Sequence, residues 1–156
     1  MELLLRRTLT TVAVLTVTLL TALAVLTAAS SGGATGAPTP VLGSPSYMAP
    51  YGVGWGTAHP RVIDNGGDPS GSVKALRWRS WGEPTTKARG LTPIFRPGGG
   101  YYRKPARIVL RATDLGTCGA ATEAYTRLEF RVAKVPGGSV SGPWRPWAGS
   151  ADLCGG

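Results

Sequence analysis

Histidine and cysteine are scarce in this sequence. Its 156 residues include one histidine, His59, and two cysteines, Cys118 and Cys154. A catalytic nucleophile needs a neighbouring base, most often a histidine, and a zinc ion needs several His, Cys or carboxylate ligands. These few residues make no recognisable zinc ligand set, and the chain has neither a P-loop nor a G-x-G-x-x-G fingerprint for nucleotides. We therefore expect no metal and no cofactor.

The acidic residues give little support for hydrolytic chemistry. A ribonuclease site would combine a carboxylate base with a histidine acid and a phosphate-binding arginine. Either Glu83 or Glu123 could supply the base, next to His59 and Arg77, although no spacing in the sequence supports the combination. The sequence therefore favours a binding protein over an enzyme, with a secreted hydrolase as an alternative.

Other acidic residues lie where turns or surfaces are expected. A glycosidase needs two opposed carboxylates. The available pairs are Asp64 with Asp68 and Glu123 with Glu129. Asp64, Asn65 and Asp68 could also bind calcium through their oxygen atoms. Side chains that accept hydrogen bonds from their own turn explain this cluster more simply, so we expect turn residues here.

The first 30 residues lack glycine, proline and aromatic residues. Arg6 and Arg7 precede an uncharged, largely apolar stretch over 8–29, which ends in small residues. These three parts predict a secretory signal peptide over 1–29. A stretch of this length could also span a hydrocarbon core of about 30 Å, so a membrane anchor with an extracellular domain is the alternative. The arginine pair leaves twin-arginine export open beside general secretion.

Glycine and proline, 23 and 13 residues in all, lie entirely after residue 30. Residues 30–46 contain no charge and few large apolar side chains, which predicts a flexible linker. A glycine and proline content this high also occurs in unstructured chains. All twelve aromatic residues nevertheless follow residue 30, and their burial can offset the loss of chain entropy. We expect a single loop-rich β domain over 47–156.

The two cysteines are expected to form one disulfide. An exported chain meets an oxidising compartment, in which paired thiols become disulfides. A bridge between Cys118 and Cys154 would close a loop of about 37 residues, for which chain entropy gives about 4 kcal/mol of stabilisation.

Three segments alternate between apolar and polar residues, as strands with one buried face do. They cover 72–82, 106–113 and 125–132, and clusters of glycine and proline separate them. We therefore expect an all-β fold: a small antiparallel β-sandwich or barrel, loop-rich, with one disulfide and preceded by a signal peptide. The expected inward residues are Leu76, Trp78, Ile108, Leu110, Leu128, Phe130 and Val132, and the expected outward residues are Arg77, Arg79, Trp81, Arg107, Val109, Arg111, Arg127, Glu129 and Arg131.

Two short segments share the pattern Trp-Arg-x-Trp, from Trp78 to Trp81 and from Trp144 to Trp147. Residues three apart in a strand face opposite sides of the sheet. One tryptophan of each pair is therefore expected in the core, and the other on the surface, where an arginine can lie over its ring. The first expectation is nevertheless that the two tryptophans of a pair are both buried anchors of a small core.

Basic residues outnumber acidic residues by 17 to 8, and they are unevenly distributed. Between Lys74 and Arg111 there are ten basic residues and one acid, Glu83. Such asymmetry points to a polyanion, a membrane surface or an anionic wall polymer as partner, with an ordinary solvated face as the alternative. If the strands share a sheet, Glu129 can pair with one or two outward arginines. The residues expected to bind the polyanion, the aromatic ones by offering flat surfaces to sugars or bases, are Arg77, Arg79, Arg107, Arg111, Trp81, Tyr101 and Tyr102.

Several short motifs rich in glycine, tryptophan and proline occur between residues 54 and 154. They are Gly54-Trp55-Gly56, His59-Pro60, Asn65-Gly66-Gly67-Asp68-Pro69-Ser70-Gly71, Trp78 to Gly82, Pro97 to Tyr102, Asp114 to Cys118, and Gly142-Pro143-Trp144. Together they resemble those of a group of uncharacterised small secreted proteins of actinomycetes. The resemblance implies an exported single domain and carries over no catalytic residue.

These observations predict an exported, disulfide-stabilised β domain that acts as a non-catalytic binding module for an anionic partner. That partner would be a wall polymer, a nucleic acid or an anionic surface. A secreted hydrolase and a structural or interaction protein of the cell envelope are the alternatives. The expected location is secreted and extracellular, and the sequence leaves the oligomeric state open.

Overall fold

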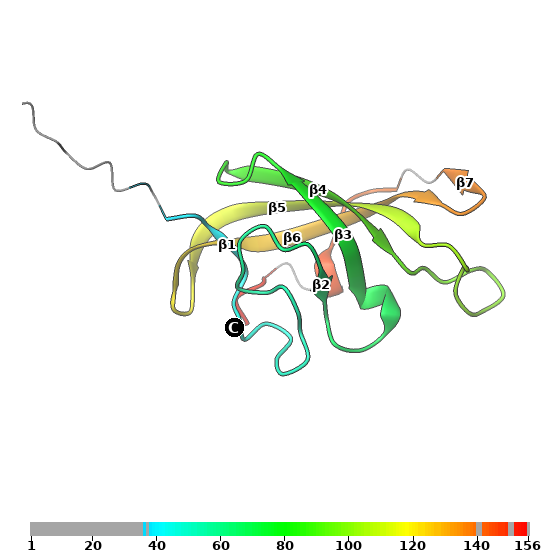
Figure 1. The fold of residues 1–156 in the computed structure, drawn as a ribbon, viewed down its shortest axis with the longest axis horizontal. Coiled ribbons are helices and arrows are strands. Elements are labelled where there is room, and N and C mark those ends of the chain that lie inside the picture. The colour runs from blue at the N-terminus through cyan, green and yellow to red at the C-terminus, as the bar shows by residue number, and fades with distance from the viewer. Residues whose placement is uncertain (1–35, 37, 140–141, 150–151, 156) are drawn as a thin grey trace, which may run out of the picture. The chain divides into compact units, whose positions relative to one another are not determined.

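The computed structural model describes residues 36, 38–139, 142–149 and 152–155. Strands dominate the described residues, and no α-helix occurs among them. The strands form one sheet that is curled into a half-barrel (Figure 1). The all-β prediction is confirmed, whereas the predicted signal peptide at 1–29 lies outside the described residues. Within the part of the chain that the structure describes, no helix has the length and hydrophobicity of a bilayer span.

Four long strands form the centre of the sheet, and each pairs antiparallel with the next along the chain. They are β3 (Ser72–Arg79), β4 (Thr85–Thr92), β5 (Ala106–Cys118) and β6 (Ala121–Val135). The strand order is β1-β6-β5-β4-β3-β2, with β7 and β8 also paired to β6, and β1 is the one strand that runs parallel to its neighbour. The short elements are β1 (Val41–Leu42), β2 (Ile63–Asp64), β7 (Gly138–Ser139), β8 (Arg145–Pro146) and the 3-10 turns η1 (Pro69–Gly71) and η2 (Trp147–Gly149).

Strands β3, β5 and β6 contain the three predicted alternating segments. Burial alternates along β5, where Ile108 and Leu110 are buried and Arg107 is exposed. Leu128 of β6 is also buried, and Phe130 packs against the core from the same face. The alternation therefore predicts that these strands exist, and it predicts the faces of these residues of β5 and β6 correctly.

The sequence pattern does not predict β4, because its inward residues are small or polar. Gly90 shows why the site demands this: a Cβ there would lie 2.6 Å from Val73 Cγ1 and 3.0 Å from the Lys74 carbonyl oxygen. The hydroxyl of Thr86 donates to the Arg79 carbonyl oxygen at 2.8 Å, which satisfies a polar group in a buried position. The close approach of β3 thus leaves no room for the large apolar residues that reveal a strand. The inward residues of β4 are Thr86, Ala88, Gly90 and Thr92.

The inner face of the sheet is covered by irregular segments before β2 and after β8 (Figure 1). Tyr47 and Trp55 come from the first segment, and their ring centroids lie 4.7 Å apart. Trp147 and Leu153 come from the second, and all four side chains are buried. The indole N–H of Trp147 donates to Asn65 Oδ1 at 3.0 Å, so the ring is buried without leaving its donor unpaired. Loops, rather than a second sheet, complete the core.

The compact fold begins earlier than the sequence predicts. Residues 30–46 are expected to form a flexible linker, but the described residues 38–46 belong to the compact unit and include β1. Leu42 of β1 is fully buried and pairs with Tyr125 of β6, and the Gly43 N–H donates to the Tyr125 carbonyl oxygen at 3.0 Å. A strand of two residues is too short to show an alternating pattern, so this part of the fold is not visible in the sequence.

Cys118 and Cys154 form the predicted disulfide, with an S–S distance of 2.05 Å. Cys118 is buried at the end of β5, and Cys154 follows the buried Leu153. The bridge therefore fixes the segment that covers the inner face to the tip of the β5–β6 hairpin. It also fits an oxidising compartment.

Trp78 and Trp81 both pack against the core, with ring centroids 4.7 Å apart. The prediction that Trp81 faces outward is wrong. Ser80 adopts a φ of 58° just after β3 ends, so the alternation of the strand does not continue to Trp81. The Trp81 ring instead lies against Tyr125, and its indole N–H donates to the Pro40 carbonyl oxygen at 2.8 Å.

Candidate polyanion-binding face

The side chains of β3 to β6 that point away from the core form the outer face of the sheet. Directly opposed residues of neighbouring strands share a face, so the strand register decides which charges meet. The register places the predicted residues Arg77, Arg79, Arg107 and Arg111 together on this face. Its rows, from β3 to β6, are Arg79, Lys87, Arg111 and Glu129; Arg77, Arg89, Val109 and Arg131; and Lys74, Leu91, Arg107 and Lys134.

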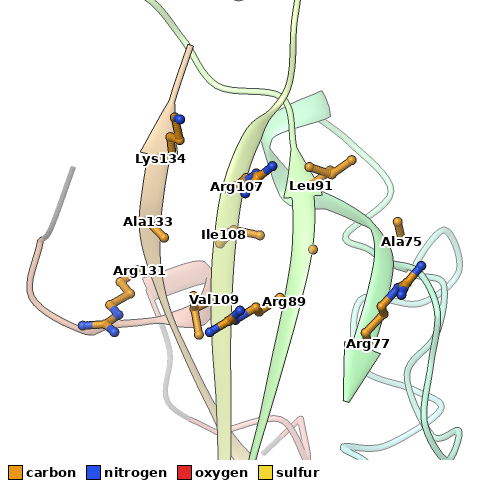
Figure 2. A pocket seen from close by; sticks show the side chains of 11 residues that line it. Ala75, Arg77, Arg89, Leu91, Arg107, Ile108, Val109, Arg131, Ala133 and Lys134 are labelled. Carbon is orange, nitrogen blue, oxygen red and sulfur yellow. The ribbon is translucent and has the colours of Figure 1, made fainter. Parts of the chain in front are cut away.

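A hollow of about 780 Å³ lies on the outer face over the second and third rows. Figure 2 shows its side chains spread across the four strands, from Arg77 on β3 to Arg131 and Lys134 on β6. Small and aliphatic residues, among them Leu91 and Val109, lie between the charged ones. We call this site the cationic hollow, because every charged residue that lines it is basic: Arg77, Arg89, Arg107, Arg131 and Lys134.

The other half of the outer face is partly neutralised. Arg111 Nη2 lies 2.6 Å from Glu129 Oε2, and Arg111 Nε donates to the same oxygen at 2.8 Å. This is the pairing expected for Glu129. At the end of the sheet near the hairpin tip, Arg127 Nη1 lies 3.9 Å from Asp114 Oδ2. The outer face is therefore divided into a half with ion pairs and the cationic hollow.

Trp144 lies against the outer face beside β6, where the adjoining β8 positions it. The guanidinium carbon of Arg111 lies 4.4 Å from the ring centroid, and that of Arg131 lies 5.0 Å from it. Trp147, three residues later, is buried. This pair therefore follows the alternation, with one core tryptophan and one surface tryptophan under an arginine, and not the two buried anchors that were expected first. The attraction between ring and guanidinium helps to hold Arg131 beside the cationic hollow.

Three aromatic residues expected beside the arginines lie elsewhere. Trp81 is packed against the core, as described above. The Tyr101 hydroxyl donates to the Asp68 carboxylate at 2.6 Å, and its ring stacks on Phe95 with a centroid distance of 4.3 Å. Tyr102 is half-buried in the loop between β4 and β5. None of the three lines the cationic hollow.

Asp64 and Asp68 stabilise their own turns. Asp64 Oδ1 accepts a hydrogen bond from the Gly66 N–H at 2.7 Å, and Asp68 Oδ1 accepts one from the Ser70 N–H at 2.8 Å. Hydrogen bonds from the Ser70 hydroxyl, Tyr101 and the Ser70 N–H hold the pKa of Asp68 below its usual value. Both aspartates thus behave as turn residues. Among the described residues, no three His, Cys, Asp or Glu side chains gather as metal ligands would.

The ribonuclease candidates do not come together. His59 is exposed, and its ring lies tilted against that of Trp81 with a centroid distance of 4.6 Å, on the core side of β3. Arg77 lies on the opposite side, in the cationic hollow. A histidine acid and a phosphate-binding arginine on opposite faces of one strand cannot act on the same phosphate.

Sequence reasoning missed three residues of the cationic hollow. Arg89 belongs to β4, which has no visible pattern. Arg131 was correctly expected to point outward from the predicted strand over 125–132. It would have been found if every outward cation of that strand had been counted among the binding residues. Lys134 opposes Arg107 across a register shift between Arg107 and Ile108. Alternation alone does not reveal such an irregularity.

Comparisons of the chain with family models, with curated proteins and with solved structures find no match. The geometry of the outer face is therefore the basis for inferring a function.

Proposed function

We propose that this protein is an exported, disulfide-stabilised β domain that binds an anionic polymer through the cationic hollow and catalyses no reaction. The composition of the hollow carries the proposal, because five basic side chains and no acidic one line it. A cell-wall polymer and a nucleic acid are the two sources of such a polymer. A purely structural role in the cell envelope is the alternative.

The cationic hollow has basic residues at directly opposed positions of neighbouring strands. Arg77 directly opposes Arg89 across β3 and β4. Like charges at directly opposed positions of neighbouring strands destabilise a sheet. Both ion pairs within the described residues use other arginines. A bound polymer would supply the negative charge, and the release of its counterions would drive binding.

The apolar surface favours a polymer over a membrane as the partner. Proteins that bind a bilayer surface combine basic residues with large apolar side chains that enter it. Among the described residues, the exposed large apolar side chains are Tyr51, Val53, Leu91 and Phe95. Of these, Leu91 alone lies on the outer face, and it is 38% exposed. The outer face therefore has the positive charge that attracts an anionic bilayer, but it has few large apolar side chains that could enter the bilayer.

Export is part of the proposal. The charged start, apolar centre and small residues of 1–29 support a cleaved signal peptide, and the disulfide supports an oxidising compartment. The resemblance to small secreted proteins of actinomycetes points the same way. N-terminal sequencing of the exported protein tests this part. An intact Met1 in the membrane fraction would show an anchored protein instead of a released one.

The salt dependence of binding tests the polymer site. If about four anionic groups are contacted, a plot of log affinity against log salt concentration should have a slope on the order of −3 to −4. Replacing Arg77 and Arg107 with glutamine should flatten that slope by about two. The control replaces Arg103 and Lys104, two exposed cations of the loop between β4 and β5, and should leave the slope unchanged.

Two results would contradict the proposal. One is equal binding by the Arg77 and Arg107 double variant. The other is the absence of binding to wall polymer and nucleic acid at low salt. Binding to anionic vesicles alone would identify a membrane surface as the partner. In each case the cationic hollow would not be a polymer site.

A further inference from the structure

Trp144 lies beside Arg131 because of the pairing between β8 and β6. The antiparallel register joins Arg145 to Phe130, and continuing it by one residue sets Trp144 opposite Arg131, on the same face of the sheet. The guanidinium carbon of Arg131 lies 5.0 Å from the centre of the Trp144 ring. Figure 2 shows the Arg131 side chain directed away from Val109, and so away from the middle of the cationic hollow. The register therefore places an aromatic ring next to a cation at the rim of the hollow.

The Trp144 ring is the main restraint on the guanidinium of Arg131. Within the described residues, Arg131 takes part in neither of the ion pairs, and its Nε is buried without a hydrogen-bond partner. Arg111 differs from Arg131 in this respect. Its guanidinium carbon lies 4.4 Å from the centre of the same ring, but two hydrogen bonds to Glu129 also hold it. Loss of the ring would therefore release Arg131 and leave Arg111 in place.

An aromatic ring can order an arginine without neutralising it. The ring attracts the charge of the guanidinium, and the N–H donors at the edge of the group remain available to an anion. The carboxylate of Glu129, in contrast, orders Arg111 and cancels its charge. A side chain that is ordered before binding spares the ligand the cost of immobilising it, which corresponds to about two- to tenfold in affinity. Trp144 thus leaves Arg131 both fixed and fully charged.

We propose that Trp144 is a positioning residue of the polymer site. Its ring holds Arg131 in place for the part of the polymer that leaves the cationic hollow over β6. The inference rests on the proposed function and adds to it an uncharged residue that does not line the hollow. Trp144 acts through Arg131, so the polymer contacts the guanidinium rather than the ring.

Affinity and salt slope together separate positioning from charge. The exported protein is titrated with a labelled single-stranded nucleic acid, or with an anionic wall polymer if the wild type does not bind the nucleic acid. Trp144→Leu should weaken binding about two- to tenfold and leave the salt slope unchanged, because every charge remains. Arg131→Gln should weaken binding and also flatten the slope by about one. Trp144→Tyr keeps an aromatic face and should bind within about twofold of the wild type.

Double variants show whether Trp144 acts through Arg131. In the Arg131→Gln background, Trp144→Leu should cause no further loss of affinity, whereas in the Arg107→Gln background it should keep its full effect. The control is Phe95→Leu, which removes a ring that is 53% exposed and lies outside the hollow, and it should bind like the wild type. Unfolding midpoints show whether each variant retains the fold. If Trp144→Leu does not fold, Trp144→Met takes its place.

Each other outcome has a defined meaning. Tighter binding by Trp144→Leu would show that the ring competes with the polymer for Arg131, and would overturn the inference. A loss of affinity that persists in the Arg131→Gln background would overturn it as well, because the ring would then act independently of Arg131. Equal binding by Trp144→Leu and the wild type would overturn the inference while the proposed polymer site stands. If neither polymer binds the wild type at low salt, the proposed function fails, and the inference fails with it.

Discussion

The inner and outer faces of the central sheet come from the same strands, but the inner face is apolar and buried while the outer face is largely charged and open to solvent. On β5, Leu110 is fully buried beneath the covering loops, while its neighbours Val109 and Arg111 belong to the outer face. Burying a large apolar side chain contributes about 1.5–3 kcal/mol, whereas an exposed ion pair contributes about 0–1 kcal/mol. Changes on the inner face should therefore alter the stability of the fold, and changes on the outer face should alter binding.

The largest effect on stability is expected at the disulfide, which holds the C-terminal segment against the inner face. Cys154→Ser should lower the free energy of unfolding by about 4 kcal/mol, because the unfolded chain is no longer constrained by a loop closed between Cys118 and Cys154. Denaturant unfolding of the variant measures the loss, and the reduced wild-type protein should match it. Two thiols that can be alkylated in the unreduced, denatured wild type would contradict the prediction.

A pair of adjacent substitutions on β5 compares the two faces directly. Leu110→Ala should cost about 3 kcal/mol, since it leaves a cavity in the core. Val109→Ala, one residue away on the outer face, should cost less than about 1 kcal/mol. Both free energies come from denaturant unfolding under the same conditions. Similar losses of unfolding free energy in the two variants would show that the outer face is also covered by other parts of the protein.

The ion pair on the outer face should affect binding more than stability. The Arg111 and Glu129 side chains are 31% and 19% exposed, so Glu129→Gln should cost no more than about 1 kcal/mol of unfolding free energy. The variant releases Arg111 to interact with a polymer, and the salt slope should become steeper by up to about one. Fluorescence titrations with a labelled single-stranded nucleic acid at several salt concentrations measure this. Weaker binding in the variant would contradict a charge-driven site.

The smallest effect is expected at the turn that holds Tyr101. The pKa of Asp68 is lowered in the folded state by hydrogen bonds from Ser70 and Tyr101. Its contribution to stability is complete above the unfolded pKa of about 3.9 and is lost as the pH falls through the lower folded value. Asp68→Asn should remove this small part of the acid dependence. A carboxyl titration by NMR that gives Asp68 a pKa at or above 3.9 would contradict the assignment.

The alternating pattern predicts β3, β5 and β6 because each buries large apolar residues at every second position. It fails for β4, where the approach of Val73 to Gly90 requires small inward residues. It also fails at Trp81, because the φ of Ser80 reverses the direction of the side chains that follow. The hidden parts are thus those in which backbone geometry, rather than hydrophobicity, selects the residue.

The candidate site was predictable to the extent that it follows the strands. Arg77 and Arg107 line the cationic hollow as outward residues of predicted strands. Arg89 depends on recognising β4, and Lys134 depends on the register shift opposite Arg107. Tyr101 belongs to a loop whose position depends on a hydrogen bond to Asp68, which is 33 residues away in the sequence. Contacts of this range are not visible in local patterns.

The order of the elements along the chain has a consequence for synthesis. The last central strand ends at Val135, while Trp147 and Leu153, which close the core, come later in the sequence. A chain that emerges from its N-terminus onward can therefore pair β3 to β6 while the part of the inner face that Trp147 and Leu153 cover is still open to water. During that interval the growing chain is prone to association with other chains and needs protection. Docking of Trp147 and Leu153 ends this vulnerable stage, and oxidation of Cys118 and Cys154 then retains Leu153 in place.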